Sequence, residues 1–214
     1  MAKTAKRKSA KKTTKAKAAK AASSRGNGSA RKSGGRSSSG GRDPMAIQLL
    51  KQDHRTVEDL FQEFEDAKKA ADKRAIAKEI CMELTIHSMI EEEIFYPAVK
   101  DVVDDEIYGE AHVEHDGAKV LIAEIMASDP SDEFYDARVK VLSEMIKHHV
   151  KEEEQRDGMF AQAKKGKGVD FDELGEQLQT RKEDLMRLMQ RNGIPAPEAR
   201  TMHGAKVKLG QPYA

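Results

Sequence analysis

The apolar positions of this chain change their pattern abruptly at Met45. Upstream of Met45 hardly a large apolar residue occurs, whereas downstream apolar residues recur every three or four positions. This spacing places them on one face of an α-helix, and Gly and Pro, which interrupt helices, are rare until Gly158. The pattern therefore predicts long amphipathic helices joined by short connections between Met45 and Gly158.

Four stripes with this spacing can be traced, one for each helix of a predicted all-α, up-down-up-down four-helix bundle. In every stripe a histidine or a glutamate occupies a place where the pattern calls for an apolar residue. The second helix is expected to follow a cap at Asp72, and the third to close at the turn over residues 128–130. The stripes comprise Ile47, Leu50, His54, Val57, Phe61 and Phe64; Ile76, Ile80, Leu84, His87, Glu91, Ile94 and Ala98; Tyr108, Ala111, His115, Ala118, Ile122 and Ile125; and Tyr135, Val139, Leu142, Ile146, His149 and Glu153.

Two of the stripes contain a His and a Glu four residues apart, which puts both side chains on the same helical face. Each such pair can direct two metal-ligating groups at one point. The other two stripes each offer a single histidine, at a comparable depth when neighbouring helices are antiparallel. The candidate metal ligands are the pairs His87/Glu91 and His149/Glu153 and the single residues His54 and His115.

These candidate ligands repeat at a similar interval in the two halves of the predicted bundle. His87 follows His54 by 33 residues, and His149 follows His115 by 34 residues. Two halves that each supply a His and then a His-x-x-x-Glu motif would meet around one centre. The repeat therefore favours a single site shared by four helices.

Histidine and glutamate suit a pair of metal ions. Imidazole binds Fe, Zn and Mn, while two carboxylates can bridge two ions and neutralise part of their charge. The stripes face the core and form the seams between the helices, and charges buried in these seams without a metal would cost several kcal/mol each. The alternative is that the histidines are hydrogen-bonded core residues and the acids a solvated face, which is the usual situation of a single His. Four successive seams with the same substitution favour the metal site.

Four segments hold these residues: QDH at 52–54, HSMIEEEIFYP at 87–97, EHD at 114–116 and HHVKEEE at 148–154. Over about residues 45–165 they resemble the signature positions of the hemerythrin HHE cation-binding family. The resemblance implies an antiparallel bundle around an oxo- or hydroxo-bridged di-iron centre that binds dioxygen, or uses it for sensing, storage or peroxide chemistry. It assigns bridging roles to Glu91 and Glu153 and terminal ligand roles to His54, His87, His115 and His149.

The expected function is therefore that of a non-haem di-iron protein. Such a protein binds dioxygen or a reactive oxygen or nitrogen species and senses, stores or detoxifies it. Weak oxidase or peroxidase activity at the di-iron centre is left open. A zinc- or manganese-binding protein on the same bundle is an alternative, because the ligand set does not exclude those metals.

The third helix departs from the pattern of the oxygen-carrying branch of this family. That branch has five histidines, including a His-x-x-x-His on the third helix, whereas position 119 here is Lys. His112 is a candidate for the fifth nitrogen, although an exposed helix histidine is the more common situation. An open coordination position would favour reaction or sensing over simple oxygen carriage.

The fourth helix offers two pairs with the same spacing. His148 and Glu152 are four residues apart, as are His149 and Glu153. The second pair is preferred because it keeps the seam of the stripe, and the first remains an alternative.

Charge divides the chain at the same point as the apolar pattern. Residues 1–44 contain 14 Lys or Arg and a single acid, Asp43, so that residues 45–214 carry a net charge of −12. The basic segment has too few apolar residues to offset the entropy of ordering and is expected to be disordered. Its charge favours salt-dependent, nonspecific association with nucleic acid. A solubilising tail is the alternative, and a DNA-associated stress-protection protein is the competing hypothesis of function.

The chain beyond the bundle is expected to add one more helix. A break at residues 166–168 is followed by Asp170 and Glu173, which together offer a capping box. From Asn192 onwards an irregular tail is predicted, so the expected organisation is a tail at 1–44, a bundle at 45–165 and a C-terminal part at 166–214. The apolar positions of the last helix are Phe171, Leu174, Leu178, Leu185 and Leu188.

Cysteine and hydropathy limit the compartment and the type of site. The single cysteine, Cys81, excludes a disulfide framework and a Cys-rich zinc site. No apolar run approaches the roughly 18 residues of a spanning helix, and the N-terminus lacks the apolar core of a secretory signal. A cytoplasmic location is expected, at the nucleoid if the tail binds DNA, with no membrane partner. Oligomeric state is not predicted.

Overall fold

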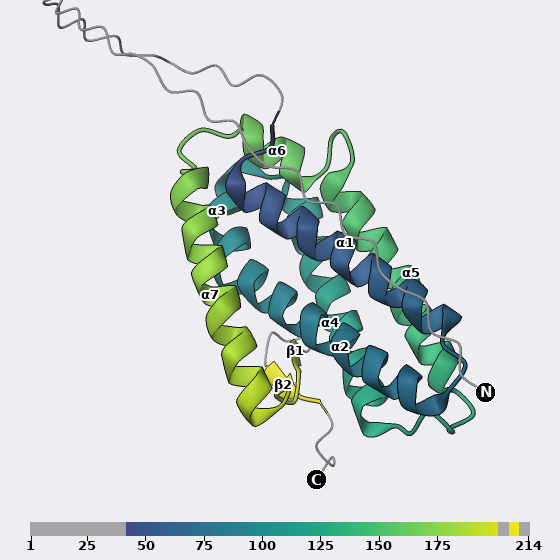
Figure 1. Cartoon of the computed structure of the whole chain (residues 1–214). Helices are drawn as coiled ribbons and strands as arrows, with labels where there is room; N and C mark the ends of the chain where they lie inside the picture. Colours follow the sequence, from purple (N-terminus) through teal and green to yellow (C-terminus); the bar gives the residue numbers. More distant parts are fainter. Residues whose placement is uncertain (1–41, 201–205, 210–214) are drawn as a thin grey trace, which may run out of the picture. The chain divides into compact units, whose positions relative to one another are not determined.

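The structure, a computed structural model, describes residues 42–200 and 206–209. Four long helices pack side by side so that each contacts two others around a shared interior (Figure 1). This arrangement confirms the predicted all-α four-helix bundle. Of the predicted disordered tail, residues 1–41 lie outside the described residues. The four helices are α1 (Met45–Asp66), α2 (Ala70–Ile90), α4 (Asp105–Ala127) and α5 (Tyr135–Glu154).

The predicted seams of α1, α4 and α5 face the interior, and their His and Glu members are buried with them. The apolar core forms two clusters, one that includes Leu50 and Phe160 and another that includes Phe61 and Leu142. His54 lies between Leu50 and Phe61 along α1, so the polar layer separates the two clusters. None of the helices described here is long and apolar enough to cross a membrane.

The second seam departs from the predicted stripe after Glu91. A π-helical turn, η1 (Glu91–Phe95), interrupts the α-helical path, which resumes as α3 (Tyr96–Val99). A π-helical turn closes with i→i+5 hydrogen bonds, so it inserts one residue and moves the buried face along by one position. Of the predicted seam residues, Ile94 is therefore only half-buried and Ala98 is exposed. The buried residues are instead Phe95, Tyr96 and Val99.

One predicted helix boundary is also different in the structure. α2 begins at Ala70, before the expected cap at Asp72, and Asp72 lies in the first turn, where its charge is favourable to the helix dipole. Pro97 does not end the second helical path, because it lies in the first turn of α3 and the 3₁₀ turn η2 (Lys100–Val102) follows. A proline in a first turn removes only an N–H that has no partner within that segment.

Two further helices follow α5. The short helix α6 (Met159–Lys165) was not distinguished in the sequence, whereas α7 (Phe171–Asn192) confirms the predicted C-terminal helix and packs on α1 and α2. Asp170 caps α7 by accepting hydrogen bonds from the backbone N–H groups of Asp172 and Glu173. The predicted core position Leu188 is exposed, and Met189 is buried in its place.

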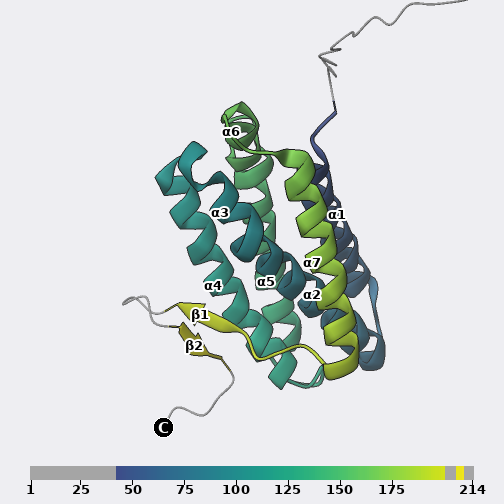
Figure 2. The same ribbon diagram turned by 90° about the vertical axis from the view of Figure 1, so that its left-hand side faces the viewer.

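The sequence analysis predicted an irregular tail after Asn192, but part of this segment forms strands. β1 (Glu198–Arg200) and β2 (Lys206–Lys208) form an antiparallel pair, and β1 crosses over α4 and contacts it (Figure 2). Ala199 is buried, and the Arg200 guanidinium donates hydrogen bonds to Asp116 of α4. These tertiary contacts stabilise strands that are too short to be recognised from their own sequence.

The junction between α5 and α6 can be tested at Gly158. A Cβ atom at this position would lie 2.2 Å from the backbone oxygen of Glu152. Gly158→Ala should therefore lower the free energy of unfolding by about 1–3 kcal/mol, seen as a lower Tm. The control is Gly109→Ala in α4, where a Cβ meets nothing within 4 Å and better helix propensity should add about 0.4–1 kcal/mol. Equal melting temperatures for the two variants would contradict the predicted clash.

Candidate metal centre

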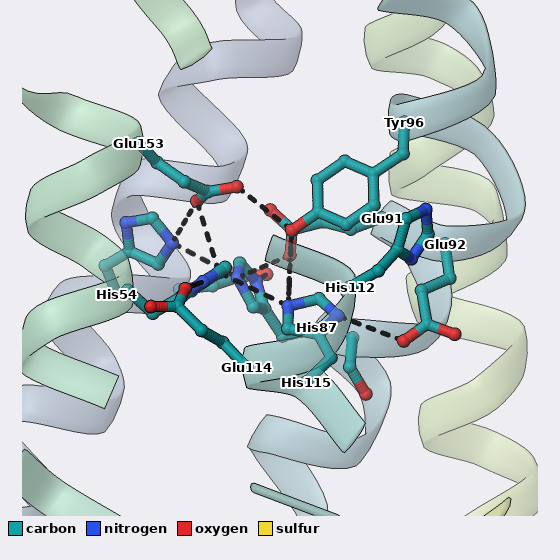
Figure 3. Close-up of polar contacts among 12 residues, drawn as sticks. His54, His87, Glu91, Glu92, Tyr96, His112, Glu114, His115 and Glu153 are labelled. Carbon is teal, nitrogen blue, oxygen red and sulfur yellow. Dashed lines mark hydrogen bonds and ion pairs between the residues drawn. The ribbon is translucent and has the colours of Figure 1, made fainter. Parts of the chain in front are cut away.

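Six buried side chains meet between the two apolar clusters (Figure 3). Their ligand atoms fall into two groups, within each of which all atoms lie within 4.8 Å of one another, and Glu91 belongs to both groups. The structure thus brings together the six candidates of the sequence analysis, whose role as ligands stays a prediction. The groups are His54, His87, Glu91 and Glu153, and Glu91, His115 and His149.

The histidines form two facing pairs. The Nε2 atoms of His54 and His87 are 3.1 Å apart, and those of His115 and His149 are 3.2 Å apart. Each pair joins helices from neighbouring positions in the bundle, α1 with α2 and α4 with α5. The two pairs reproduce in space the two halves of the sequence repeat.

Each carboxylate contacts one histidine from each pair. Oε2 of Glu91 lies 3.2 Å from Nε2 of His87 and 3.4 Å from Nε2 of His115. Oε2 of Glu153 lies 3.3 Å from Nε2 of His54 and 3.7 Å from Nε2 of His149. Both carboxylates are therefore placed between the pairs, which is the position that a bridging ligand requires.

The outward-facing Nδ1 atom of every one of these histidines lies beside a further carboxylate. His54 Nδ1 is 2.7 Å from Glu154, and His149 Nδ1 is 2.8 Å from Glu114. His115 Nδ1 is 3.0 Å from Glu92, and His87 Nδ1 is at an ion-pair distance of 3.5 Å from Asp53. Carboxylates in this position orient metal-binding imidazoles and increase their basicity. We call Asp53, Glu92, Glu114 and Glu154 the outer carboxylates.

The outer carboxylates close a ring around the bundle. Asp53 of α1 contacts a histidine of α2, and Glu92 of η1 contacts one of α4. Glu114 of α4 contacts a histidine of α5, and Glu154 of α5 contacts one of α1. Sequence analysis missed this function. The available signal was an acid directly adjacent to a candidate ligand on each helix, but its partner lies on another helix, and helical periodicity carries no information on that pairing.

The outer carboxylates fix the tautomer of the histidines. An ionised carboxylate can only accept a hydrogen bond, so the proton of each neutral imidazole resides on Nδ1 and Nε2 presents a lone pair. Two lone pairs then face each other at 3.2 Å in the His115–His149 pair. Oε1 of Glu91 is also buried without a hydrogen-bond partner in the described part of the chain, and Oε2 of Glu153 has only the imidazoles of His54 and His149 nearby, at 3.3 and 3.7 Å. Such a donor set fits metal ions, which accept lone pairs from all six residues.

The charges at the centre perturb one another strongly. Burial, together with the neighbouring charge of Glu153, raises the pKa of Glu91 to about 7. Burial opposes protonation of His54, but hydrogen bonds to Glu153 and Glu154 outweigh it and raise the pKa of His54 to about 10. Burial also works against ionisation of Glu153, yet the His149 charge and the His54 hydrogen bond lower its pKa to about 2. Protons thus occupy this site in the absence of other cations.

Tyr96 covers the carboxylates from the side of α3. Its hydroxyl lies 3.1 Å from Glu153 Oε1, 3.3 Å from Glu91 Oε2 and 3.2 Å from His115 Nε2. Burial and the nearby carboxylates keep the pKa of Tyr96 well above its ordinary value, so the hydroxyl remains a donor. The π-helical turn is responsible for this contact. With about 4.4 residues per turn, it brings position 96 onto the face of Glu91, whereas five residues in an α-helix would not.

The alternative ligands of the sequence analysis lie outside the cluster. His148 is 62 % exposed in its side chain and contacts Glu114 at 3.3 Å, and Glu152 is half-buried away from the centre. His112 was expected to be exposed, but it is half-buried. Its ring packs edge-on against the rings of Tyr96 and Tyr108. Neither histidine joins the two groups of converging ligand atoms.

A small cavity adjoins the four histidines on their side away from Tyr96. It has about 20 Å³ of space for a water-sized molecule, and its other walls are mostly aliphatic, with Val57, Leu84 and Ile122 among them. Lys119 lies at its edge and donates a hydrogen bond of 2.6 Å to Glu92. The cavity has the size of one very small ligand and excludes a larger substrate.

Comparisons with known proteins agree with this arrangement. The family model for the "Hemerythrin HHE cation binding domain" matches residues 45–161. A curated DNA nickase from Nostoc sp. is 30% identical over 114 residues, which are 53% of this chain and 32% of that protein, so the chain spans about a third of its length. A crystal structure of a hemerythrin HHE cation-binding domain-containing protein from Mycobacterium kansasii shares the fold, with a TM-score of 0.59 and 24% identity over 70% of this chain and 94% of that chain.

Glu114 tests the importance of the outer carboxylates. Glu114→Ala removes the acceptor of His149 Nδ1 and should weaken metal binding about 10- to 100-fold, because the imidazole loses orientation and basicity. Affinity is measured by competition with a chelator, and helicity by circular dichroism. The control is Glu110→Ala, an exposed position one turn earlier on the same helix. If both variants bind metal with the same affinity, the outer carboxylate has no such function.

Proposed function

The chain belongs to the hemerythrin HHE cation-binding domain family, and on this basis we propose that its bundle holds a non-haem di-iron centre. In this proposal the centre binds dioxygen or a reactive oxygen or nitrogen species for sensing, storage or detoxification. The observation that carries the proposal is the inward orientation of four imidazole Nε2 atoms in two pairs, at 3.1 and 3.2 Å. Lone pairs at these distances repel each other unless a cation lies between them.

The two pairs of histidines support two ions in preference to one. His54 and His87 would hold one ion, and His115 and His149 the other. Glu91 and Glu153, each in contact with one histidine from both pairs, would bridge the ions and offset part of their charge. Iron at this site would supply the electrons for binding or reducing dioxygen or peroxide. Zinc or manganese on the same ligands is the alternative, since imidazole and carboxylate also suit those metals.

The surroundings of the centre favour a very small ligand. The adjoining cavity has about 20 Å³ of space and mainly aliphatic walls, which suits a diatomic molecule better than an organic substrate. Tyr96 keeps its proton and donates toward the carboxylates, so it holds a proton beside the centre. Position 119 carries Lys where the oxygen-carrying branch has His, and its ammonium is engaged by Glu92. These features favour reaction or sensing over carriage.

Metal content tests the proposal directly. Protein loaded anaerobically with ferrous iron should retain about two ions per chain and change its visible spectrum when air is admitted. His87→Ala should lose iron, together with the stabilisation that a ligand bound only to the folded state provides, about 2.7 kcal/mol at a hundred times the Kd. The control, His148→Ala, alters an exposed histidine and should retain both properties.

Three outcomes of this measurement are decisive. Full iron content and an unchanged spectrum in His87→Ala would show that the site is misplaced. No retained metal in the unaltered protein would overturn the metal centre itself. Preferential retention of zinc or manganese, with no optical response to air, would favour the alternative metals over iron.

Nucleic-acid association is a second candidate function, supported by the basic N-terminal segment. Fourteen positive charges against one negative charge in residues 1–44 suffice for strong polyanion binding. The curated relative from Nostoc sp. is described as a DNA nickase, although this chain spans about a third of it. In this proposal the tail holds the metal centre near DNA, where the centre would keep iron and peroxide apart.

Deletion of the tail tests this second candidate. Full-length protein should bind duplex DNA without sequence preference, and the log–log slope against salt should increase by about 0.9 for each neutralised phosphate. A 45–214 fragment should lose this binding because it carries a net charge of −12, while its metal content stays unchanged. A full-length control with the order of residues 1–41 scrambled should bind as the original does. DNA binding by the fragment at the original strength would contradict the proposal.

A further inference from the structure

A second and larger cavity lies against the metal site. It has a volume of about 450 Å³ and is bounded by α2, η1 and α4 on one side and by residues 195–197 and the strands β1 and β2 on the other. Ser88 and Lys119 line both this cavity and the small one beside the histidines. We call the larger cavity the vestibule, and these two side chains form its junction with the metal site.

The paired strands present charged side chains to the vestibule. Glu198 lies opposite Lys208, and Arg200 lies opposite Lys206, and all four line the cavity. Like charges directly opposite each other on neighbouring strands repel. Arg200 is compensated by Asp116, at 2.9 Å. Lys206 has no acidic partner in the described part of the chain, so its charge is available to a ligand.

Two of the three acidic side chains that line the vestibule, Glu92 and Glu93, are already paired with cations. Glu92 accepts a hydrogen bond of 2.6 Å from Lys119, and Glu93 accepts one of 2.7 Å from Arg181 of α7. Glu198 lies opposite a lysine in the strand pair. The uncompensated charge that faces the vestibule is therefore positive.

This local charge is opposite in sign to that of the domain around it. Residues 45–214 carry a net charge of −12, so most of the surface repels small anions. A recess lined by cations concentrates anions, because its low-dielectric walls focus the field. Lys119, with 13% of its side chain exposed, brings an ammonium group to the junction, where it is paired with Glu92 at 2.6 Å and lies 3.5 Å from Asp116.

We propose that the vestibule is the entrance to the metal centre and that it selects small inorganic anions, with Lys119 at its inner end. The inference rests on the proposed function and narrows its ligand class to anionic oxygen or nitrogen species. An anion on this path moves from the ammonium of Lys206 to that of Lys119. It therefore keeps a counter-charge while it loses water, which offsets the cost of its burial.

A thiol placed at the junction measures the selectivity of this path without any metal. In full-length Ser88→Cys the rate of alkylation by iodoacetate, an anion, is compared with that by iodoacetamide, a neutral reagent of similar size. The ratio of the two rates cancels the reactivity of the thiol itself. Cys81, the sole native cysteine, is buried, and unaltered protein gives the background. A second thiol, in Met89→Cys, reports on the vestibule beyond the junction.

At low salt, the ratio of the iodoacetate rate to the iodoacetamide rate at position 88 should be on the order of ten times that of a free cysteine peptide. The ratio should decrease as salt is added. Lys206→Gln/Lys208→Gln should reduce the ratio to that of the peptide, whereas the exposed control Lys78→Gln/Lys140→Gln should leave it unchanged. The iodoacetamide rate alone reveals any widening caused by loosened strands.

If Ser88→Cys with its lysines unaltered gives the same ratio of rates as the free cysteine peptide, the proposed anion selectivity is wrong. Anion-preferring alkylation at position 89 with no reaction at 88 would overturn the entrance. The iron content of the same samples is measured separately. An absence of iron refutes the proposed function and leaves the selectivity result valid, while retained iron with a peptide-like ratio refutes the entrance alone.

Discussion

Four imidazoles and two carboxylates share the centre of an otherwise apolar bundle, and their mutual charge constrains everything around them. A buried carboxylate without compensation costs several kcal/mol, and Glu91 and Glu153 are 0% and 1% exposed. The outer carboxylates turn the imidazole lone pairs inward and thereby increase the negative potential at the centre. The bundle therefore concentrates donors at one place and requires cations there, either protons or metal ions. The apolar clusters on both sides hold the donors in position.

The same constraint explains why contacts between carboxylates and histidines link the helices in a ring. Helices α1, α4 and α5, and the turn η1 that continues α2, each supply an inner ligand and, from the adjacent position, an outer carboxylate for another helix. An inner residue and its neighbour differ by about 100° around an α-helix, so one faces the centre while the other reaches the next helix. A change in the packing of one helix thus displaces a histidine on another. Metal binding and bundle geometry are coupled through these contacts.

The C-terminal part of the chain adds a second layer of charge outside the stretch matched by the family model, residues 45–161. Lys182 of α7 contacts Asp53, and Arg200 of β1 lies 3.7 Å from Glu92. Two of the four outer carboxylates are therefore shared between a histidine and a cation of the C-terminal segment. Sharing reduces the charge that each carboxylate offers to its imidazole. In this way residues far from the inner ligands in sequence influence the electrostatics of the centre.

The sequence by itself determined the four bundle helices, most of their buried faces and the six inner residues. A helix places residues three and four positions apart on one face, so His87 with Glu91, and His149 with Glu153, had to point together. The internal repeat then indicated a common centre. Periodicity failed at one particular place: after Glu91 a π-helical turn moves the seam from Ile94 and Ala98 to Tyr96 and its neighbours.

Tertiary structure alone decided which carboxylate serves which histidine, that Tyr96 reaches Glu91 and Glu153, and that a vestibule forms against α4. Most of these contacts join residues from different elements, and some join residues more than 80 positions apart, as in Arg200 with Asp116 and Glu154 with His54. Their geometry depends on how helices and strands pack. A local pattern reports which face of a helix is buried, but the partner that this face meets is settled by the packing of the whole chain.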